Sequence, residues 1–174
     1  MPGPAEAGHF YALPGYLVAR AFHNSFLLIY TVKGLGEFET PAGKVFLEAG
    51  ASVLIDCHKP HKYCSVDGEW EFLWMHFDGP LAALSFELTG GLPRPVKPRD
   101  PASFSRDFQT VTELINHGEP LTLLRCEKLM TDLLYAFCES TAVQNGGTQM
   151  DSIVSDITDY INSNYREQLT VAEL

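Results

Sequence analysis

Short runs of aromatic and β-branched residues fill the sequence between residues 16 and 78, and turn-forming residues bound each run at roughly eight- to twelve-residue spacing. This spacing is typical of a β-sandwich or a β-barrel. The turns are expected at 34–36, 41–43, 49–50 and 67–68, where glycine accepts a positive φ without a steric penalty. The predicted strands are residues 16–22, 26–32, 36–40, 44–47, 52–55, 61–66 and 71–77.

The hydrophobic period changes after Asp78, and a proline-rich stretch at 93–101 is predicted to be a linker that lies over the barrel. Two amphipathic helices are expected beyond it. The first has apolar residues spaced 4, 3 and 4 apart, with Ser103 as its cap and Gly118 at its end: Phe104, Phe108, Val111 and Ile115. The second has the 3, 4, 3, 4 spacing of a short coiled-coil contact: Leu123, Cys126, Met130, Leu133 and Phe137.

The end of the sequence has an organisation of its own. Residues 144–150, with Asn145, Gly146 and Gly147 among them, are polar enough for an interdomain linker. A further helical stripe follows in 151–174, and Thr170 to Glu173 form a capping box, which is a helix start. One turn is too short for a helix to be stable, so we expect the chain to end inside an element that it does not complete.

Charge and composition restrict the partners. The 174 residues carry 12 Lys and Arg against 22 Asp and Glu, so the chain as given is repelled by phosphate backbones. Its longest apolar stretch, 26–30, is too short to cross a bilayer, and its start lacks an export signal. We therefore expect a cytoplasmic protein without a membrane partner, in which the four cysteines are reduced thiols.

Five short motifs in order, together with the tail, resemble AraC-family transcription regulators. The motifs are Leu-Pro-Gly-Tyr at 13–16, Tyr-Thr-Val-Lys-Gly-Leu-Gly at 30–36, Glu-Ala-Gly at 48–50, Pro-His-Lys-Tyr at 60–63 and Trp-Met-His-Phe at 74–77. They are similar to the sensor domain of that family over residues 13–140. Residues 157–165 and 169–174 resemble the opening of its paired helix-turn-helix domain, and this part of the match is the more specific.

The resemblance implies a mainly β fold with α, in which a cupin-like (jelly-roll) β-barrel is followed by an antiparallel helical hairpin. It also implies a small-molecule effector, commonly a sugar, and a homodimer that places two DNA-binding domains on two half-sites. DNA would be bound only through the missing C-terminal domain, and no cofactor is implied. The expected organisation is an arm at 1–14, the barrel at 15–92, the linker and dimerisation hairpin at 93–143, the interdomain linker at 144–150, and the truncated DNA-binding domain at 151–174.

Trp74 is the first candidate for effector binding, because an indole face is a flat apolar platform for the C–H face of a sugar. By the period of two, Phe72, Trp74, His76 and Asp78 share one face, while Leu73, Met75 and Phe77 share the other. We expect one face to line the barrel cavity and the other to pack under the helices. The alternative is that Trp74 only fills the barrel.

Arg20 shares a strand face with Tyr16 and Val18, and a guanidinium in such surroundings needs an acceptor, which a hydroxyl-rich or carboxylate ligand supplies. The resemblance places Arg20, Tyr63 and Trp74 at positions that contact the effector in the arabinose-binding member of the family. That member's cavity histidine falls near Phe72, so the resemblance does not point to arabinose itself. The alternative for Arg20 is a surface residue at the barrel rim.

The cluster Cys57-His58-x-x-His61-x-x-Cys64 offers zinc-type ligands, but strand alternation directs Cys64 away from His61, so we expect no metal site. His61 is instead a candidate cavity or rim residue. The chain has no His-x-His pair of the kind with which cupin enzymes hold a metal. A metal-dependent cupin isomerase or dioxygenase is therefore the second hypothesis, and the first is a sensor without catalysis.

Two further expectations concern the second predicted helix and the N-terminal segment. The helical stripe from Leu123 to Phe137 is first of all core, but its apolar width also makes it the candidate dimerisation surface. The N-terminal segment is polar or small except for Phe10, Tyr11 and Leu13, and is predicted to close over a bound ligand as an arm.

Overall fold

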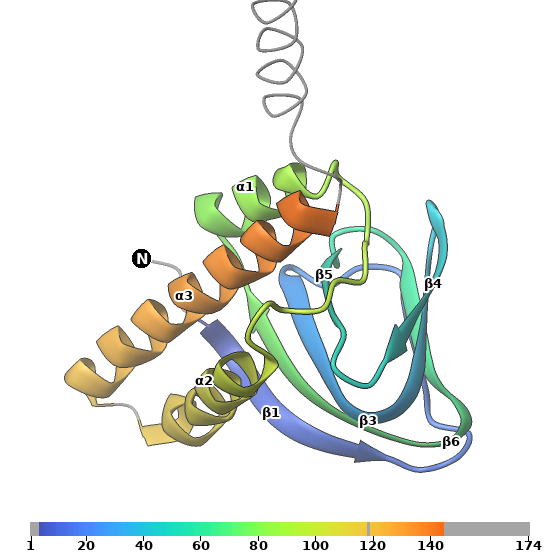
Figure 1. Cartoon of the computed structure of the whole chain (residues 1–174), viewed down its shortest axis with the longest axis horizontal. Helices are drawn as coiled ribbons and strands as arrows, with labels where there is room; N and C mark the ends of the chain where they lie inside the picture. The colour runs from blue at the N-terminus through green and yellow to red at the C-terminus, as the bar shows by residue number, and fades with distance from the viewer. Residues whose placement is uncertain (1–3, 118, 145–174) are drawn as a thin grey trace, which may run out of the picture. The chain divides into compact units, whose positions relative to one another are not determined.

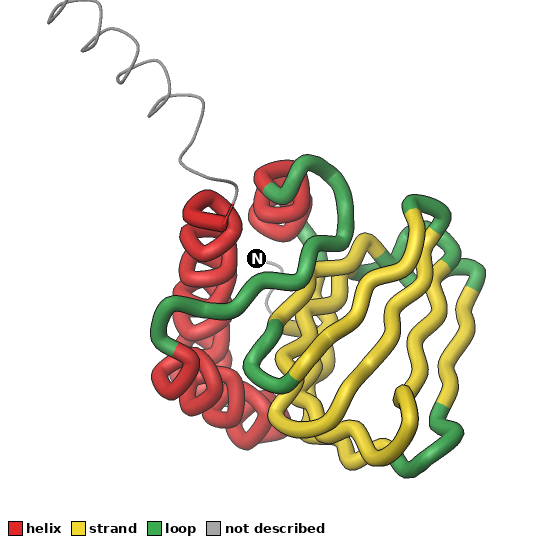
Figure 2. The backbone as a smooth tube through the Cα atoms, turned by 45° about the vertical axis from the view of Figure 1, so that its right-hand side comes forward, coloured by secondary structure: helices red, strands yellow, loops and turns green. Residues whose placement is uncertain are grey.

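A six-stranded antiparallel sheet is the centre of the computed structural model, which describes residues 4–117 and 119–144. In the described residues the elements are β1 (Pro4–Ala12), β2 (Leu17–Arg20), β3 (Phe26–Thr40), β4 (Gly43–Glu48), β5 (Ser52–Asp56), β6 (His61–Phe77), α1 (Pro80–Leu88), α2 (Pro101–Leu114), the 3-10 helix Ile115–His117 and α3 (Pro120–Gln144). Residues up to Thr141 form one compact unit. The helices lie on one side of the sheet (Figures 1 and 2). Most of the predicted interdomain linker and the predicted start of a DNA-binding domain, 145–174, lie outside the described residues.

The long strands β3 and β6 pair with each other and carry all the other strands. The order is β1-β6-β3-β4, with β2 added to β6 and β5 added to β3. This arrangement confirms the cupin-like β fold followed by helices. It differs from the predicted barrel in one respect: among the described strands, the hydrogen-bonded path does not return on itself, so the sheet is not closed.

Two predicted turns are irregularities inside these long strands. Gly34 and Gly36 lie within β3, and Asp67 and Gly68 lie within β6. Between the pairs Gly36↔Ser65 and Gly34↔Trp70, β3 advances by two residues while β6 advances by five. The surplus residues leave the ladder as a bulge, and Asp67 takes a φ of 52° there. The two turns predicted at 41–43 and 49–50 are confirmed as the connections that flank β4.

The N-terminal segment forms strand β1, which the prediction of an arm missed. It pairs with β6 from Glu6↔His76 to Ala12↔Trp70. Its apolar residues are too few to show alternation by themselves, and Gly8 weakens the pattern further. Gly8 has a packing reason, because a Cβ there would approach the Trp74 indole to 3.0 Å.

The helices confirm two predictions and add one element. α2 and α3 cover the two predicted helices, although the N-cap of α2 is Asp100, whose carboxylate accepts from the Ser103 backbone N–H, and not Ser103 itself. Within the stretch predicted to be a linker, Val96 exchanges two backbone hydrogen bonds with Ser52, the first residue of β5. α1 was not predicted, because only Ala82, Ser85 and Phe86 are buried along it, a stripe shorter than two turns.

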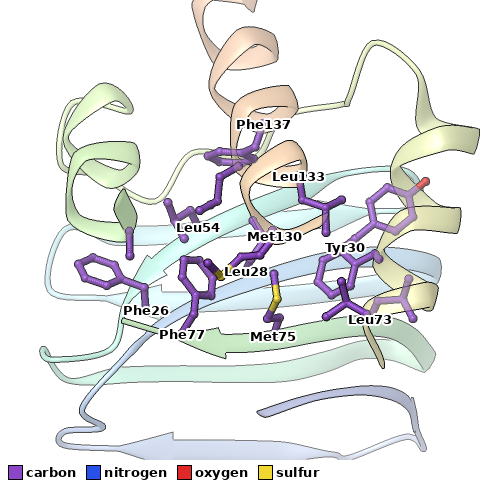
Figure 3. Close-up of a cluster of buried hydrophobic side chains, with 14 of the residues drawn as sticks. Phe26, Leu28, Tyr30, Leu54, Leu73, Met75, Phe77, Met130, Leu133 and Phe137 are labelled. Atoms are coloured by element: carbon purple, nitrogen blue, oxygen red, sulfur yellow. The ribbon is translucent and has the colours of Figure 1, made fainter. Parts of the chain in front are cut away.

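Each face of the sheet carries its own hydrophobic cluster, as the alternation in β6 predicted. Leu73, Met75 and Phe77 pack with α1, α2 and α3 in the outer cluster, drawn in Figure 3. Phe72 and Trp74 belong to the inner cluster, on the face away from the helices. Trp70 is central to that cluster and donates from Nε1 to the Thr31 hydroxyl at 3.1 Å.

The apolar stripe of α3 mostly packs into the outer cluster. Met130, Leu133 and Phe137 pack with strand residues in that cluster, Cys126 is also buried, and of the five residues only Leu123 is exposed. Four of the five predicted dimerisation residues are therefore core residues of the single chain, which was the alternative interpretation of the stripe.

We expect Phe137→Ala to lower the free energy of unfolding by about 3–5 kcal/mol, because a fully buried phenyl ring is replaced by a cavity. The matched control is Tyr135→Ala on the same helix. Its side chain is 70% exposed, so the change should stay within about 0.5 kcal/mol. Urea unfolding of both variants measures the difference. If the two variants have equal free energies of unfolding and only Phe137→Ala loses a dimer, the ring lies in an interface between two chains.

Candidate functional site

Strand register places one set of side chains on the inner face of the sheet. Across β1 and β6 the facing pairs are Glu6↔His76 and Phe10↔Phe72, and across β2 and β6 they are Val18↔Tyr63 and Arg20↔His61. Directly opposed residues share a face, so these strands direct their side chains to one region. A cavity of about 150 Å³ lies there. It is lined by Glu6, Phe10, Tyr16, Val18, Arg20, Leu27, Ile29, Tyr63, Phe72, Trp74 and His76.

Aromatic rings form one wall of the cavity. The ring centroids of Phe10 lie 4.9 Å from Tyr16 and 5.5 Å from Phe72, and those of Tyr16 and Tyr63 are 6.2 Å apart. Burial raises the pKa of Tyr16 and of Tyr63, so both phenols stay protonated at neutral pH. This wall offers flat apolar surface with hydroxyl groups at its edge.

A chain of hydrogen bonds crosses the polar end of the cavity. The hydroxyl of Ser25 lies 2.8 Å from Nδ1 of His76 and 2.7 Å from Nδ1 of His23. A hydroxyl has one proton, so it donates to one imidazole and accepts from the other. The two imidazole rings are 4.4 Å apart, which fixes their mutual orientation.

This polar end disfavours protonated imidazole rings. Burial, and then the positive charges of His23, Arg20 and His61, lower the pKa of His76 to about 4. Burial and Arg20 also lower the pKa of His23, while Glu6 opposes them. The surroundings of both rings therefore disfavour an added proton, and Glu6 is the only carboxylate among the residues that line the cavity.

Arg20 connects the cavity with an outer cleft of about 480 Å³. The cleft is lined by the end of β2, the β3–β4 turn and the start of β6, and Arg20 belongs to both linings. His61 lies in the cleft on the same face as Arg20. Its Nδ1 lies 2.9 Å from the carbonyl of Lys59, and its buried Nε2 has no hydrogen-bond partner among the described residues.

The structure brings together six of the seven residues that the sequence singled out for ligand binding. Tyr16, Arg20, Tyr63, Phe72, Trp74 and His76 all line the cavity. The seventh, His61, lines the neighbouring cleft. Their roles in binding stay predictions. Sequence reasoning missed Glu6 and Phe10, which reach the cavity only because β1 is a strand, and Leu27 and Ile29, which the alternation within residues 26–32 could have indicated.

The four residues of the cysteine–histidine cluster do not converge. The His58 ring contacts the carboxylate of Asp56 at 2.8 Å, and burial raises the pKa of the Cys57 thiol to about 12, which disfavours the thiolate that a metal requires. All four cysteines are free. Within the described part of the chain, no three His, Cys, Asp or Glu side chains lie close enough to hold a metal ion. No helix of that part is both long and apolar enough to cross a membrane.

Fold and cavity define a small-molecule-binding domain of cupin-like architecture, with a helical layer on the opposite face of its sheet. The family comparison agrees: residues 3–134 match the AraC-like ligand binding domain, and the chain belongs to this family. This confirms the resemblance found in the sequence. No curated protein matches the chain.

Solved structures resemble the fold at low sequence identity. ToxT from Vibrio cholerae, solved with a bound unsaturated fatty acid, is 8% identical with a TM-score of 0.51, over 81% of this chain and 55% of ToxT. The Cupin_2 domain of an XRE-family regulator from Enterobacter cloacae is 19% identical (TM-score 0.36), over 46% of this chain and 96% of that domain. An HTH_3-family regulator from Vibrio cholerae is 15% identical (TM-score 0.39), over 41% of this chain and 42% of its own.

The stability of the domain should fall as the pH drops from about 6.5 to about 4. In this range an unfolded histidine binds a proton, whereas folded His76 with its pKa of about 4 does not, so acid favours the unfolded chain. Unfolding free energies measured across the range should show a smaller slope in His76→Asn. That variant keeps a polar group near Ser25 but cannot titrate. An identical slope in both proteins would exclude His76 as the source.

Proposed function

We propose that this domain senses a small polar effector in the cavity on the inner face of the sheet and passes the signal to a DNA-binding domain of a transcription regulator. The observation that carries the proposal is the joint lining of one cavity by Trp74 and His76 from β6 and Arg20 from β2, residues of different chemistry. Effector sites combine apolar walls with a few placed polar groups. In this proposal the domain binds its effector without transforming it.

Trp74 is the proposed platform for the effector. It is partly buried, its indole contacts Gly8 of β1, and its ring meets His76 edge-on at 5.6 Å. A sugar ring would place its C–H face on the indole and its hydroxyls toward Arg20 and His76. β1 would then act as the cover that the sequence assigned to an arm, because it contributes Glu6 and Phe10 to the lining.

The route from effector to DNA runs through β6 in this proposal. Trp74 and His76 face the cavity, and Met75 between them packs in the outer cluster with Met130 and Leu133 of α3. The effector favours one arrangement of the linked domains only by its differential affinity for the two arrangements. ToxT supports a small-molecule site in this fold, since its structure holds an unsaturated fatty acid. We place such a regulator in the cytoplasm.

Trp74→Ala should weaken effector binding by roughly tenfold or more, because the apolar platform and its aromatic contact are both lost. The first measurement is a thermal-shift screen of sugars and small metabolites, followed by calorimetric titration of each stabilising compound. Phe46→Ala is the matched control, because Phe46 is an exposed aromatic residue on β4 away from the cavity.

Equal affinities in the two variants would exclude the inner cavity as the binding site. Turnover of the stabilising compound would favour a cupin enzyme over a sensor.

We also propose a homodimer, with the contact on the exposed start of α3 and not on its buried stripe. Leu121, Leu123 and Leu124 are all exposed there. The double variant Leu121→Glu/Leu124→Glu should be a folded monomer in analytical ultracentrifugation, because four carboxylates in a pair of chains would face an apolar contact. A dimer that persists with unchanged affinity would place the contact elsewhere.

A further inference from the structure

We infer that the effector is a small carboxylate, whose anionic group binds between Arg20 and His61 while its body lies along the aromatic wall of the cavity. This inference rests on the proposed function of the cavity and names the class of molecule that it takes.

The first support is the state of Arg20. Arg20 is exposed and lines both the cavity and the cleft, and its side chain makes no hydrogen bond or ion pair with the described residues. Two carboxylates share these linings. Glu39 in the cleft pairs with Lys44 and Lys62, and Glu6 in the cavity lies opposite His76 in the ladder. A guanidinium is built to hold a carboxylate in a bidentate pair.

The second support is His61. Its side chain is only 4% exposed, and its Nε2 has no partner in the described part of the chain. Register places His61 directly opposite Arg20 on the same face of the sheet. A buried polar atom without a partner is costly, so this nitrogen is suited to a group that arrives with the ligand.

The third support is the sign of the surrounding charge. The titratable and charged groups around His61 and the cavity are Glu6 on β1, Arg20 on β2, His23 before β3, Glu39 on β3, and Lys62, Tyr63 and His76 on β6. Arg20, His23 and His61 all disfavour a proton on His76. Lys62 pairs with Glu39, so Arg20 is the permanent cation that an anionic ligand would neutralise, whereas a neutral sugar would not.

The geometry of His61 also separates the two ligand classes. Because Nδ1 lies within hydrogen-bonding distance of the Lys59 carbonyl, it carries a proton, and Nε2 of the neutral ring is an acceptor. A sugar hydroxyl would donate to it at any neutral pH. A carboxylate ion has no proton to donate, so it would bind mainly through the Arg20 guanidinium, and only a ring that carries both protons would add a hydrogen bond from Nε2.

The test compares carboxylates with neutral molecules of the same frame: benzoate with benzamide, galacturonate with galactose, and glucuronate with glucose. Thermal shift and calorimetric titration are made on the full chain and on three variants. We expect at least one carboxylate to bind more tightly than its neutral partner. Arg20→Gln should weaken that binding roughly tenfold to a hundredfold, and the surface control Arg99→Gln should leave it unchanged.

If no carboxylate binds, or if Arg20→Gln and Arg99→Gln bind it equally, the inference is overturned. If only neutral sugars bind, and Trp74→Ala abolishes that binding, the inference of a carboxylate effector is overturned and the proposed sensor function stands. If a carboxylate binds and neither Trp74→Ala nor Arg20→Gln changes its affinity, the cavity is also excluded as the binding site.

Discussion

The pairing of β3 with β6 is the constraint on which the rest of the structure depends. These strands of 15 and 17 residues lie side by side along most of their length, and every other strand is added to one of them. Alternate residues of β6 enter two different clusters, one toward the helices and one toward the cavity. Because a slip of one residue would exchange the two faces, the register itself decides that Trp74 faces the cavity and Met75 packs in the cluster with α3. The register shifts at the bulge around Asp67 and again between Thr31 and Lys33, and the pairs from Phe26↔Phe77 to Thr31↔Phe72 keep a single register.

Local pattern was enough to predict the parts of the fold that repeat with a period. The alternation from Phe72 to Phe77 predicted both faces of β6, and the helical spacing predicted α2 and α3. The same reasoning mistook two strand irregularities for turns, because glycine and Asp-Gly pairs suit a bulge as well as a hairpin. Only the opposing strand distinguishes these cases, and it is far away in the sequence. α1 was not predicted, because its buried residues form a stripe shorter than two turns and show too little helical periodicity.

Sequence analysis likewise identified some residues of the candidate site and missed others. Tyr16, Trp74 and their neighbours were found because aromatic residues alternate within single strands and because a family resemblance marked some of the positions. Phe10 was not found as a lining residue, since it reaches the cavity only by pairing opposite Phe72. The bond from Ser25 to His76 joins residues 51 positions apart, and no spacing in the sequence indicates it. Contacts between strands therefore account for what sequence analysis missed.

A concentration of groups that can carry positive charge is unfavourable in a small fold, and here the sheet core offsets its cost. His76 is nearly buried and held neutral, and Arg20 and His23 both act against its protonation. Such an arrangement lowers stability, so its presence beside a cavity favours function over packing as the reason for these residues. Because the backbone of β6 also carries the outer cluster, a ligand bound beside His76 would act on the same strand that packs with α3. In the proposed function, effector binding and the packing of the helical layer then depend on the same strand. Such a shared element is what allows an effector to shift the balance between two arrangements of the linked domains.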